Sequence, residues 1–199
     1  TLDGTVGIGP VDGDVDMNAG DVFSSLDMAF LGLYAGEGER WGVVGDVIYM
    51  DLSEDDISGP AGILTGEVGN KQVIALGSAS YRVSDTTRLL FGLMYTDVTA
   101  DIRIDSPINS RYAKTSESWV DPVVGVLFNK PIASNWEFTG MAQIGGGAGA
   151  DLVYALTASV AWNFGERTSL TLGYRYLDFD YEDGSGAGRF KFDMKQHGP

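Results

Sequence analysis

The stretch LVYALTASVAWNF, residues 152–164, alternates between two kinds of side chain. Large residues such as Tyr154 and Trp162 occupy every second position, and small or polar residues such as Thr157 and Ser159 occupy many of the positions between them. A period of two places successive side chains on opposite faces of a β-strand. The stretch therefore predicts a strand with one bulky apolar face and one small, more polar face.

The two faces suit an outer-membrane β-barrel, where bulky apolar side chains meet lipid and small polar ones line the lumen. A soluble β-sandwich or barrel would instead enclose its bulky face. Alternation by itself is compatible with both architectures, so the pattern of turns and loops has to separate them.

The same alternation recurs along the chain and predicts about ten strands, within a range of eight to twelve. Further strands are expected near 24–35, 40–52, 71–83, 88–104, 118–130, 136–145 and 168–181, with partial ones at 1–8 and from 189 onward. Tight turns are expected near 36–39, 84–87, 131–135 and 165–167, and longer polar loops near 9–22, 53–69, 105–117 and 182–188, with a shorter one at 146–151. Short turns at one rim and long loops at the other are typical of outer-membrane barrels. We therefore expect an all-β fold, a single antiparallel up-and-down transmembrane β-barrel domain over residues 1–199.

Composition agrees with this fold class and excludes several functions. The chain has 28 glycines and 11% aromatic residues, which suit a strongly bent sheet with rings at an interface. The longest apolar runs, as at 152–162, are shorter than the ~20 residues of a membrane-spanning helix. A net charge of −15 argues against nucleic acid as a partner, and the absence of cysteine excludes disulfides and thiolate chemistry. No signal peptide is recognisable, and because Thr1 opens inside a strand-like pattern we expect the sequence to start after one.

Aromatic residues near the ends of predicted strands suggest a girdle at the membrane–water interface. The candidate girdle residues are Trp41, Trp119, Trp136, Trp162 and Phe164. Each could alternatively be an ordinary core or sheet aromatic, and the repetition at strand ends favours the girdle.

Charged residues also fall at positions that the alternation turns inward. They are Asp27, Asp46, Arg82, Arg88, Asp121, Glu137 and Arg175. Inside a narrow barrel such groups must pair or meet water, because an unpaired buried charge is costly. They predict either an ion-pair network that fills the lumen or a narrow charged pathway, and the small size of the barrel favours the first.

Motifs for metal binding and catalysis are weak. Asp12, Asp14 and Asp16 begin like a calcium-binding EF-hand loop, but Met17 stands where that loop requires glycine. The glycine-rich segment 146–151 matches one calcium-binding β-helix repeat, which functions only in tandem. His197 is the only histidine and has no nucleophile beside it in the sequence, so we expect a structural role for it. No metal site, cofactor or enzymatic activity is predicted.

Several segments resemble a poorly characterised, porin-like family of proteobacterial outer-membrane β-barrel proteins. They are LDGTVG at 2–7, RWGVVGDVIYMDLS at 40–53, WVDPVVGV at 119–126 and GYRYLDFDY at 173–181. The resemblance covers nearly the whole chain and implies a barrel in the outer membrane of a Gram-negative cell envelope. Members of that family continue beyond the equivalent of Gln196–Pro199 to a terminal aromatic residue, which implies that the last strand here is incomplete. The family carries no established reaction.

The function expected from these observations is that of a non-enzymatic integral outer-membrane protein, either structural or a narrow passive pore with a charged, largely plugged lumen. Its partners would be the lipid bilayer and lipopolysaccharide, with an envelope protein as a further partner. Two alternatives remain at this point: a surface protein whose long acidic loops bind a partner, a polymer or a divalent cation, and a soluble periplasmic β-barrel or sandwich that carries a ligand.

Overall fold

A computed structural model describes residues 1–58, 65–106, 109–165 and 168–199 of the chain. The strands are β1 (Leu2–Ile8), β2 (Val11–Met17), β3 (Leu26–Glu37), β4 (Trp41–Ser58), β5 (Thr65–Arg82), β6 (Thr87–Ser106), β7 (Asn109–Ala133), β8 (Trp136–Gly145), β9 (Leu152–Asn163), β10 (Ser169–Asp183) and β11 (Phe190–Gly198). The helix α1 (Ala19–Ser24) connects β2 to β3, and a short 3-10 helix, η2 (Gly186–Gly188), lies between β10 and β11.

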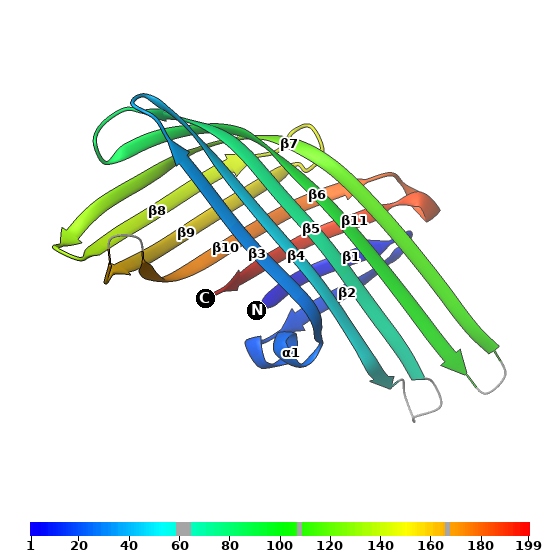
Figure 1. Cartoon of the computed structure of the whole chain (residues 1–199). Coiled ribbons are helices and arrows are strands. Elements are labelled where there is room, and N and C mark those ends of the chain that lie inside the picture. Colours follow the sequence, from blue (N-terminus) through cyan, green and yellow to red (C-terminus); the bar gives the residue numbers. More distant parts are fainter. Residues whose placement is uncertain (59–64, 107–108, 166–167) are drawn as a thin grey trace.

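All eleven strands form one antiparallel sheet in the order β2-β1-β11-β10-β9-β8-β7-β6-β5-β4-β3. The sheet curls into a half-barrel, so that β3 to β6 lie across from β10, β11, β1 and β2 (Figure 1). β1 pairs with β11, and this pairing brings the two termini together. In the described part of the chain the edge strands β2 and β3 are not paired with each other. The predicted all-β antiparallel fold is therefore confirmed, and its eleven strands fall within the expected range.

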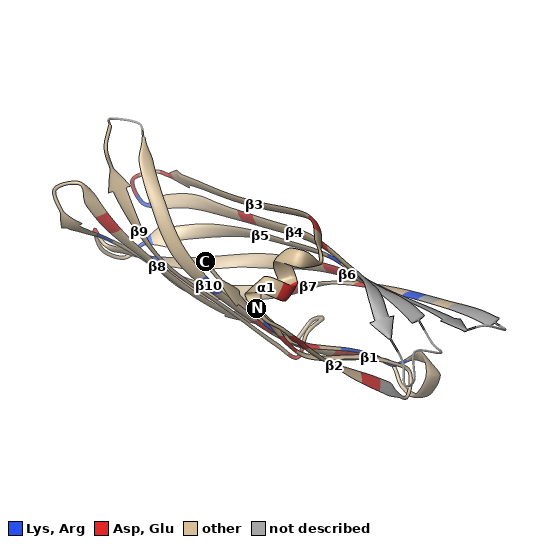
Figure 2. Cartoon of the chain, turned by 90° about the horizontal axis from the view of Figure 1, so that it is seen from below, with Lys and Arg blue, Asp and Glu red and all other residues tan. Residues whose placement is uncertain are grey.

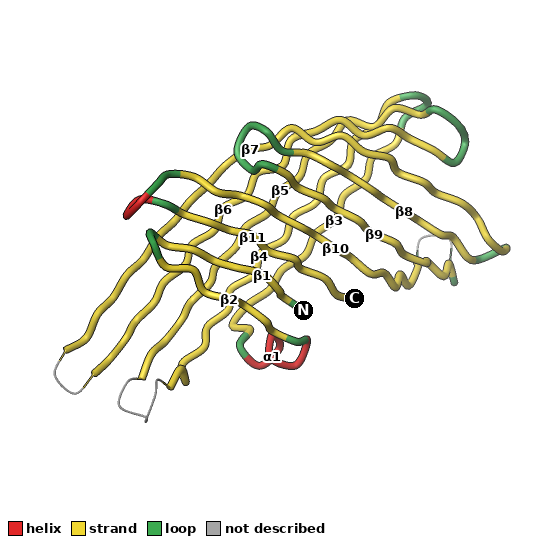
Figure 3. The backbone as a smooth tube through the Cα atoms, turned by 180° about the vertical axis from the view of Figure 1, so that it is seen from behind, coloured by secondary structure: helices red, strands yellow, loops and turns green. Residues whose placement is uncertain are grey.

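The two ends of the sheet differ (Figure 3). At the end that we call the turn end, β3, β5 and β7 connect to the next strand through 38–40, 83–86 and 134–135, close to the predicted tight turns. β9 also ends there, at Asn163, and the turn predicted at 165–167 falls largely outside the described residues. At the opposite end, which we call the hairpin end, the paired strands β4–β5 and β6–β7 extend far along the sheet.

The predicted long loops were largely wrong, because strand pairing continues through them. Residues 11–17, expected in a loop, form β2 and pair along their whole length with β1. Much of 53–69 and 105–117 likewise belongs to the paired ends of β4–β5 and β6–β7, while 59–64 and 107–108 lie outside the described residues. Polar composition suggested loops in these segments, but backbone hydrogen bonds to a neighbouring strand do not require apolar side chains.

The inner face of the sheet carries a packed apolar core toward the hairpin end. Phe179 on β10 and Phe192 on β11 are almost completely buried there, with ring centroids 6.1 Å apart. Val98 on β6 and Trp119 on β7 belong to the same cluster, so the core joins strands that lie across the curl from one another. The prediction of a polar lumen is therefore wrong for this half of the interior.

Replacement of a core phenylalanine tests this assignment of the inner face. We expect Phe179→Ala to lower the free energy of unfolding by about 4 kcal/mol, because it leaves a cavity in a packed core. Leu172→Ala, on the same strand but on the exposed outer face, should cost less than about 1 kcal/mol. Urea unfolding followed by tryptophan fluorescence measures both, and equal losses would contradict the assignment.

Candidate functional site

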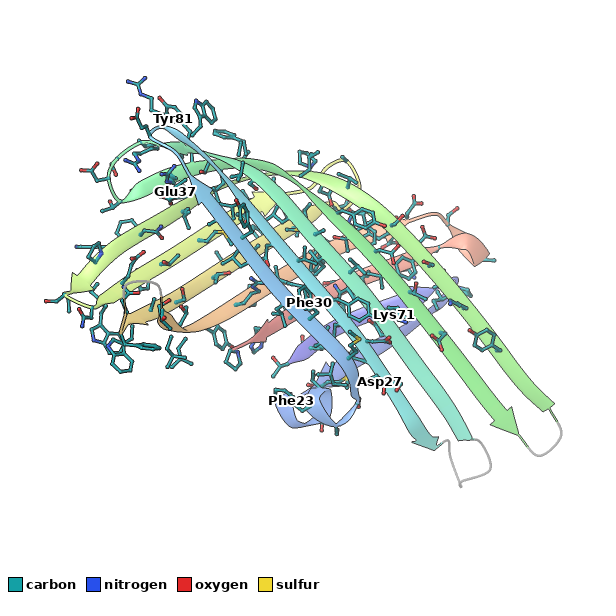
Figure 4. The ribbon with its side chains drawn as sticks, viewed as in Figure 1. Phe23, Asp27, Phe30, Glu37, Lys71 and Tyr81 are labelled. Carbon is teal, nitrogen blue, oxygen red and sulfur yellow. The ribbon has the colours of Figure 1, made fainter. Side chains whose placement is uncertain are left out.

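The outer face of the sheet toward the turn end is covered by exposed large apolar side chains. This set, which we call the apolar belt, comprises Phe30, Tyr34, Trp41, Val43, Val47, Leu89, Phe91, Leu93, Tyr95, Val120, Val124, Val126, Trp136, Ile144, Tyr154, Leu156, Trp162, Leu170, Leu172 and Tyr174. The residues lie at outward-facing positions of β3, β4 and β6 to β10, and Phe30 is labelled among them in Figure 4. Soluble monomers rarely expose a contiguous apolar surface of this extent.

A row of tyrosine–aspartate pairs marks the end of the apolar belt on the hairpin-end side. On each of three strands the phenol hydroxyl donates a hydrogen bond to the carboxylate two residues farther along the same face. The pairs are Tyr49 with Asp51 (3.0 Å) on β4, Tyr95 with Asp97 (3.3 Å) on β6 and Tyr176 with Asp178 (2.7 Å) on β10. In the paired register, Tyr49 and Asp97 both align with Val73 of β5, so the pairs on β4 and β6 lie at nearly the same level of the sheet.

Beyond these pairs both faces of the sheet reverse their polarity, as β10 shows. Up to Tyr176 its outer face carries apolar residues such as Leu172, and its inner face carries Arg175. Beyond Tyr176 the outer face carries Asp178, Asp180 and Glu182, and the inner face carries Leu177, Phe179 and Tyr181. The outer faces of β11, β1 and β2 continue this charged surface, and the charged residues of the chain are coloured in Figure 2.

Aromatic residues border the apolar belt at the turn end. Trp41 and Tyr81 are in edge contact with ring centroids 4.9 Å apart, and Trp136 and Trp162 stack at 6.1 Å. Four of the five predicted girdle residues, Trp41, Trp136, Trp162 and Phe164, are exposed here.

Trp119 was assigned wrongly to the girdle. It is only 6% exposed and stacks on Tyr181 inside the sheet, with ring centroids 3.9 Å apart. Its position at the start of an apolar run suggested a strand end, but β7 begins ten positions earlier, at Asn109.

The interior toward the turn end contains buried charges among apolar side chains such as Val44, Leu90 and Leu127. Arg175 on β10 and Asp46 on β4 form an ion pair with a nitrogen–oxygen distance of 2.7 Å across the curl of the sheet. These two residues line a void of only about 10 Å³ together with Gln143, whose amide has no hydrogen-bond partner among the described residues. A void of this size holds about one water molecule at most. Asp46 and Arg175, which the sequence predicted to face inward, thus form an ion pair in this structure.

Two further predicted lumen charges are buried but have other partners. Arg88 donates to Glu37, the last residue of β3, at 3.0 Å near the turn end. Asp121 accepts hydrogen bonds from the backbone N–H groups of Gly149 (2.8 Å) and Ala150 (3.1 Å), and so fixes the 146–151 loop. The predicted single network is thus a set of separate contacts.

The remaining predicted lumen charges are less enclosed. Asp27 is exposed at a β-bulge, where it accepts a hydrogen bond from the Ser53 hydroxyl (2.6 Å), so its assignment to the lumen was wrong. The bulge inserts one residue between Leu26 and Met28 and shifts the alternation on which the assignment rested. Arg82 pairs in register with Arg88 but is exposed at the turn end, and Glu137 is half-buried.

An ion-pair cluster at the hairpin end joins β2 and β10 to the segment that precedes β11. Arg189, which precedes β11, donates to Glu182 of β10 and to Asp12 of β2, both at 2.6 Å. Its guanidinium, through these hydrogen bonds, lowers the pKa of Asp12 below the ordinary value of 3.8 and that of Glu182 below 4.5. The Glu182 and Asp12 carboxylates in turn raise the pKa of Arg189.

His197 links the two ends of the chain. Its Nε2 atom lies 2.7 Å from the Thr1 hydroxyl, and its Nδ1 atom lies 2.5 Å from the Tyr174 hydroxyl. These contacts fit the structural role expected for it. Within the described ranges no group of three or more His, Asp or Glu residues is arranged to hold a metal ion.

No helix in the part of the chain that the structure describes has the length and apolarity needed to span a bilayer. Comparisons with protein-family models, with curated proteins and with solved structures found no match to this chain.

Loss of one partner of the interior ion pair should destabilise the protein. Arg175→Met leaves the Asp46 carboxyl buried without its partner, and we expect it to lower the free energy of unfolding by about 3 kcal/mol. The double variant Asp46→Leu with Arg175→Met should recover most of this loss. Denaturant unfolding measures both, with Lys130→Met, an exposed residue, as the control. A single and a double variant of equal stability would contradict the pairing.

The Arg189 cluster predicts a pH dependence. Because the folded-state pKa values of Asp12 and Glu182 are lowered, their contribution to stability is present above the unfolded values of about 4 and is lost as the pH falls through the folded values. Arg189→Gln should flatten the dependence of the melting temperature on pH in this acid range. Lys195→Gln, an exposed residue of β11, is the control and should leave the dependence unchanged.

Proposed function

We propose that this chain is an integral outer-membrane β-barrel protein with a structural role, whose lipid-facing surface is the apolar belt. The observation that carries the proposal is the confinement of the belt between two borders, aromatic residues at the turn end and the tyrosine–aspartate pairs on the other side. Tyrosine and tryptophan prefer the membrane–water interface, since an apolar ring and a polar group are both accommodated there. A carboxylate held by each tyrosine would lie on the aqueous side.

The height of the belt supports this placement. Trp41 and Tyr49 on β4 lie eight positions apart, as do Tyr154 and Trp162 on β9. At ~3.4 Å per residue this is about 27 Å along the strand, and a strand tilt of ~40° reduces it to roughly 20 Å across the membrane. The apolar bands of outer-membrane barrels are about 25 Å tall, so the height of the belt comes within about 5 Å of such a band.

The outer membrane is the membrane that we propose, with lipid and lipopolysaccharide as the surroundings of the belt. A sheet can lie within a bilayer only if its edges are covered or closed, because unpaired backbone groups are costly in hydrocarbon. The pairing of β1 with β11 already joins the ends of the chain, and α1 links the two remaining edges. We propose that the wall closes into a barrel across this link.

The interior favours a structural role over that of a passive pore. Ion conduction needs a continuous aqueous path, and the void around Asp46 and Arg175 is about 10 Å³. We therefore expect the purified protein to be silent in planar bilayers, and Asp46→Ala with Arg175→Ala to open measurable conductance. Steady conductance by the unaltered protein would support the pore instead.

An arginine substitution at two depths of one strand tests membrane insertion. Leu93 and Thr99 both lie on the outer face of β6, Leu93 within the apolar belt and Thr99 beyond the tyrosine–aspartate pairs. We expect Leu93→Arg to cost about 2–4 kcal/mol and to reduce the amount of folded barrel in the outer-membrane fraction, because the charge would lie in hydrocarbon. Thr99→Arg should cost no more than about 1 kcal/mol.

The measurement is the faster migration of the unboiled, detergent-extracted protein on a gel, compared with boiled samples. In a soluble protein Leu93 would face water, since it is 58% exposed, and both arginine variants would behave alike. Equal behaviour of the two variants, or recovery of the unaltered protein without detergent, would contradict the proposal.

A further inference from the structure

A cavity of about 700 Å³ lies inside the sheet on the hairpin-end side of the tyrosine–aspartate level. β1, β2 and β11 enclose it on one side, β4 and β5 enclose it on the other, and α1 borders it at the unpaired edge of the sheet. It is separate from the small void around Asp46, with which it shares no lining residue. A volume of this size is in the range of small-molecule binding sites.

Most of the cavity wall is apolar. Leu2, Val6 and Ile8 of β1 contribute to it, together with Leu52 of β4 and Phe192 of β11. The register places Val6 and Ile8 progressively farther toward the hairpin end than Leu2. The apolar part of the cavity is therefore elongated along β1, which suits a chain-like molecule better than a compact polar one.

Two glutamines form a polar floor to this cavity. Gln196 of β11, which pairs in register with Leu2, donates a hydrogen bond to the side-chain oxygen of Gln72 on β5 at 2.7 Å. Gln72 is only 1% exposed, and its amide nitrogen has no hydrogen-bond partner among the described residues. A buried donor without a partner is costly, so this amide is a position where a ligand oxygen would be stabilising.

The charges near the cavity limit the charge that a ligand can carry. Asp21 of α1 is the acidic residue of the lining whose side chain is not committed to the outer face of β2, as those of Asp14 and Asp16 are, and no lysine or arginine is among the described residues that line the cavity. An anionic head group would enter this region without a cation to pair with it. An uncharged head group avoids both the repulsion and the desolvation of a charge.

We propose that this cavity binds an uncharged single-chain amphiphile, such as a long-chain alcohol. Its chain lies along Val6, Ile8 and Phe192, and its oxygen accepts a hydrogen bond from the Gln72 amide. The site belongs to the sheet interior and does not depend on the membrane proposal. If the protein failed the fractionation test and still bound such a ligand, the membrane proposal would be contradicted and the ligand proposal would stand.

The test uses the full chain held in an amphipol, so that detergent does not compete for the cavity. The neutral fluorescent probe N-phenyl-1-naphthylamine is added, and four compounds of equal chain length compete with it: dodecanol, dodecane, dodecyltrimethylammonium and dodecanoate. Amphipol without protein gives the background. We expect saturable displacement, with dodecanol binding about fivefold more tightly than dodecane, which lacks the oxygen, and more tightly than the charged compounds.

Two substitutions address the two parts of the site. Gln72→Leu should abolish the preference for dodecanol over dodecane while dodecane still binds. Gly13→Phe should weaken all ligands at least tenfold by filling the cavity, since a Cβ at Gly13 would meet its nearest atom at 3.7 Å and is tolerated. Ala100→Phe fills the cavity from β6 and serves if Gly13→Phe does not fold. Gln143→Leu is the matched control, because Gln143 is an equally buried glutamine of the other void.

The absence of saturable displacement by the unaltered protein would overturn the proposal. So would tighter binding of dodecanoate than of dodecanol, or an unchanged preference for dodecanol in Gln72→Leu. Unchanged affinity in folded Gly13→Phe and Ala100→Phe would place the ligand elsewhere and overturn it as well.

Discussion

The hydrogen-bonded register of one antiparallel sheet, which runs from β2 to β3 and shifts only at bulges within the described residues, is the constraint on which the rest of this structure depends. Once neighbouring strands are paired, every side chain is committed to the inner or the outer face, and a strand changes face only at a bulge. Where the surroundings of a strand change along its length, the types of residue on its two faces must therefore change, while the alternation between the faces continues. β10 does this at Tyr176: before it, leucines face outward and Arg175 faces inward, and after it, acidic residues face outward and Leu177 and Phe179 face inward.

This exchange divides the molecule into two zones with different interiors. Toward the turn end, apolar residues face outward, and the inner face is closed by the pairing of Asp46 with Arg175. Toward the hairpin end, charged residues face outward, and the inner face holds the aromatic core and the cavity above the two glutamines. The proposed membrane placement and the proposed ligand site thus belong to different zones of a single sheet, and each can be altered without the other.

Alternation in the sequence was sufficient to predict the fold class, most strands and the turn end. It also placed Asp46 and Arg175 inside, because β4 and β10 keep a strict period of two around them. It could not place Trp119 or Glu37, whose surroundings come from strands far away in the sequence. The face of Asp27 was predicted wrongly because a bulge shifts the alternation there. β2 was predicted as a loop because of its aspartates, although backbone pairing between strands does not require apolar side chains. The apolar interior near Phe179 could not be predicted, because the sequence alone does not show which face of each half of β10 turns inward.

The pairing of β1 with β11 also governs when the protein can fold. Leu2 is opposite Gln196, and Thr1 contacts His197 across a sequence separation of 196 residues. β1 is therefore without one of its two neighbours until residues 190–198 have been synthesised. Contacts of such high sequence separation form slowly, because the ends of a long loop must first meet. Until residues 190–198 are available, the growing chain accordingly carries an open strand edge at β1, and this edge needs protection from aggregation.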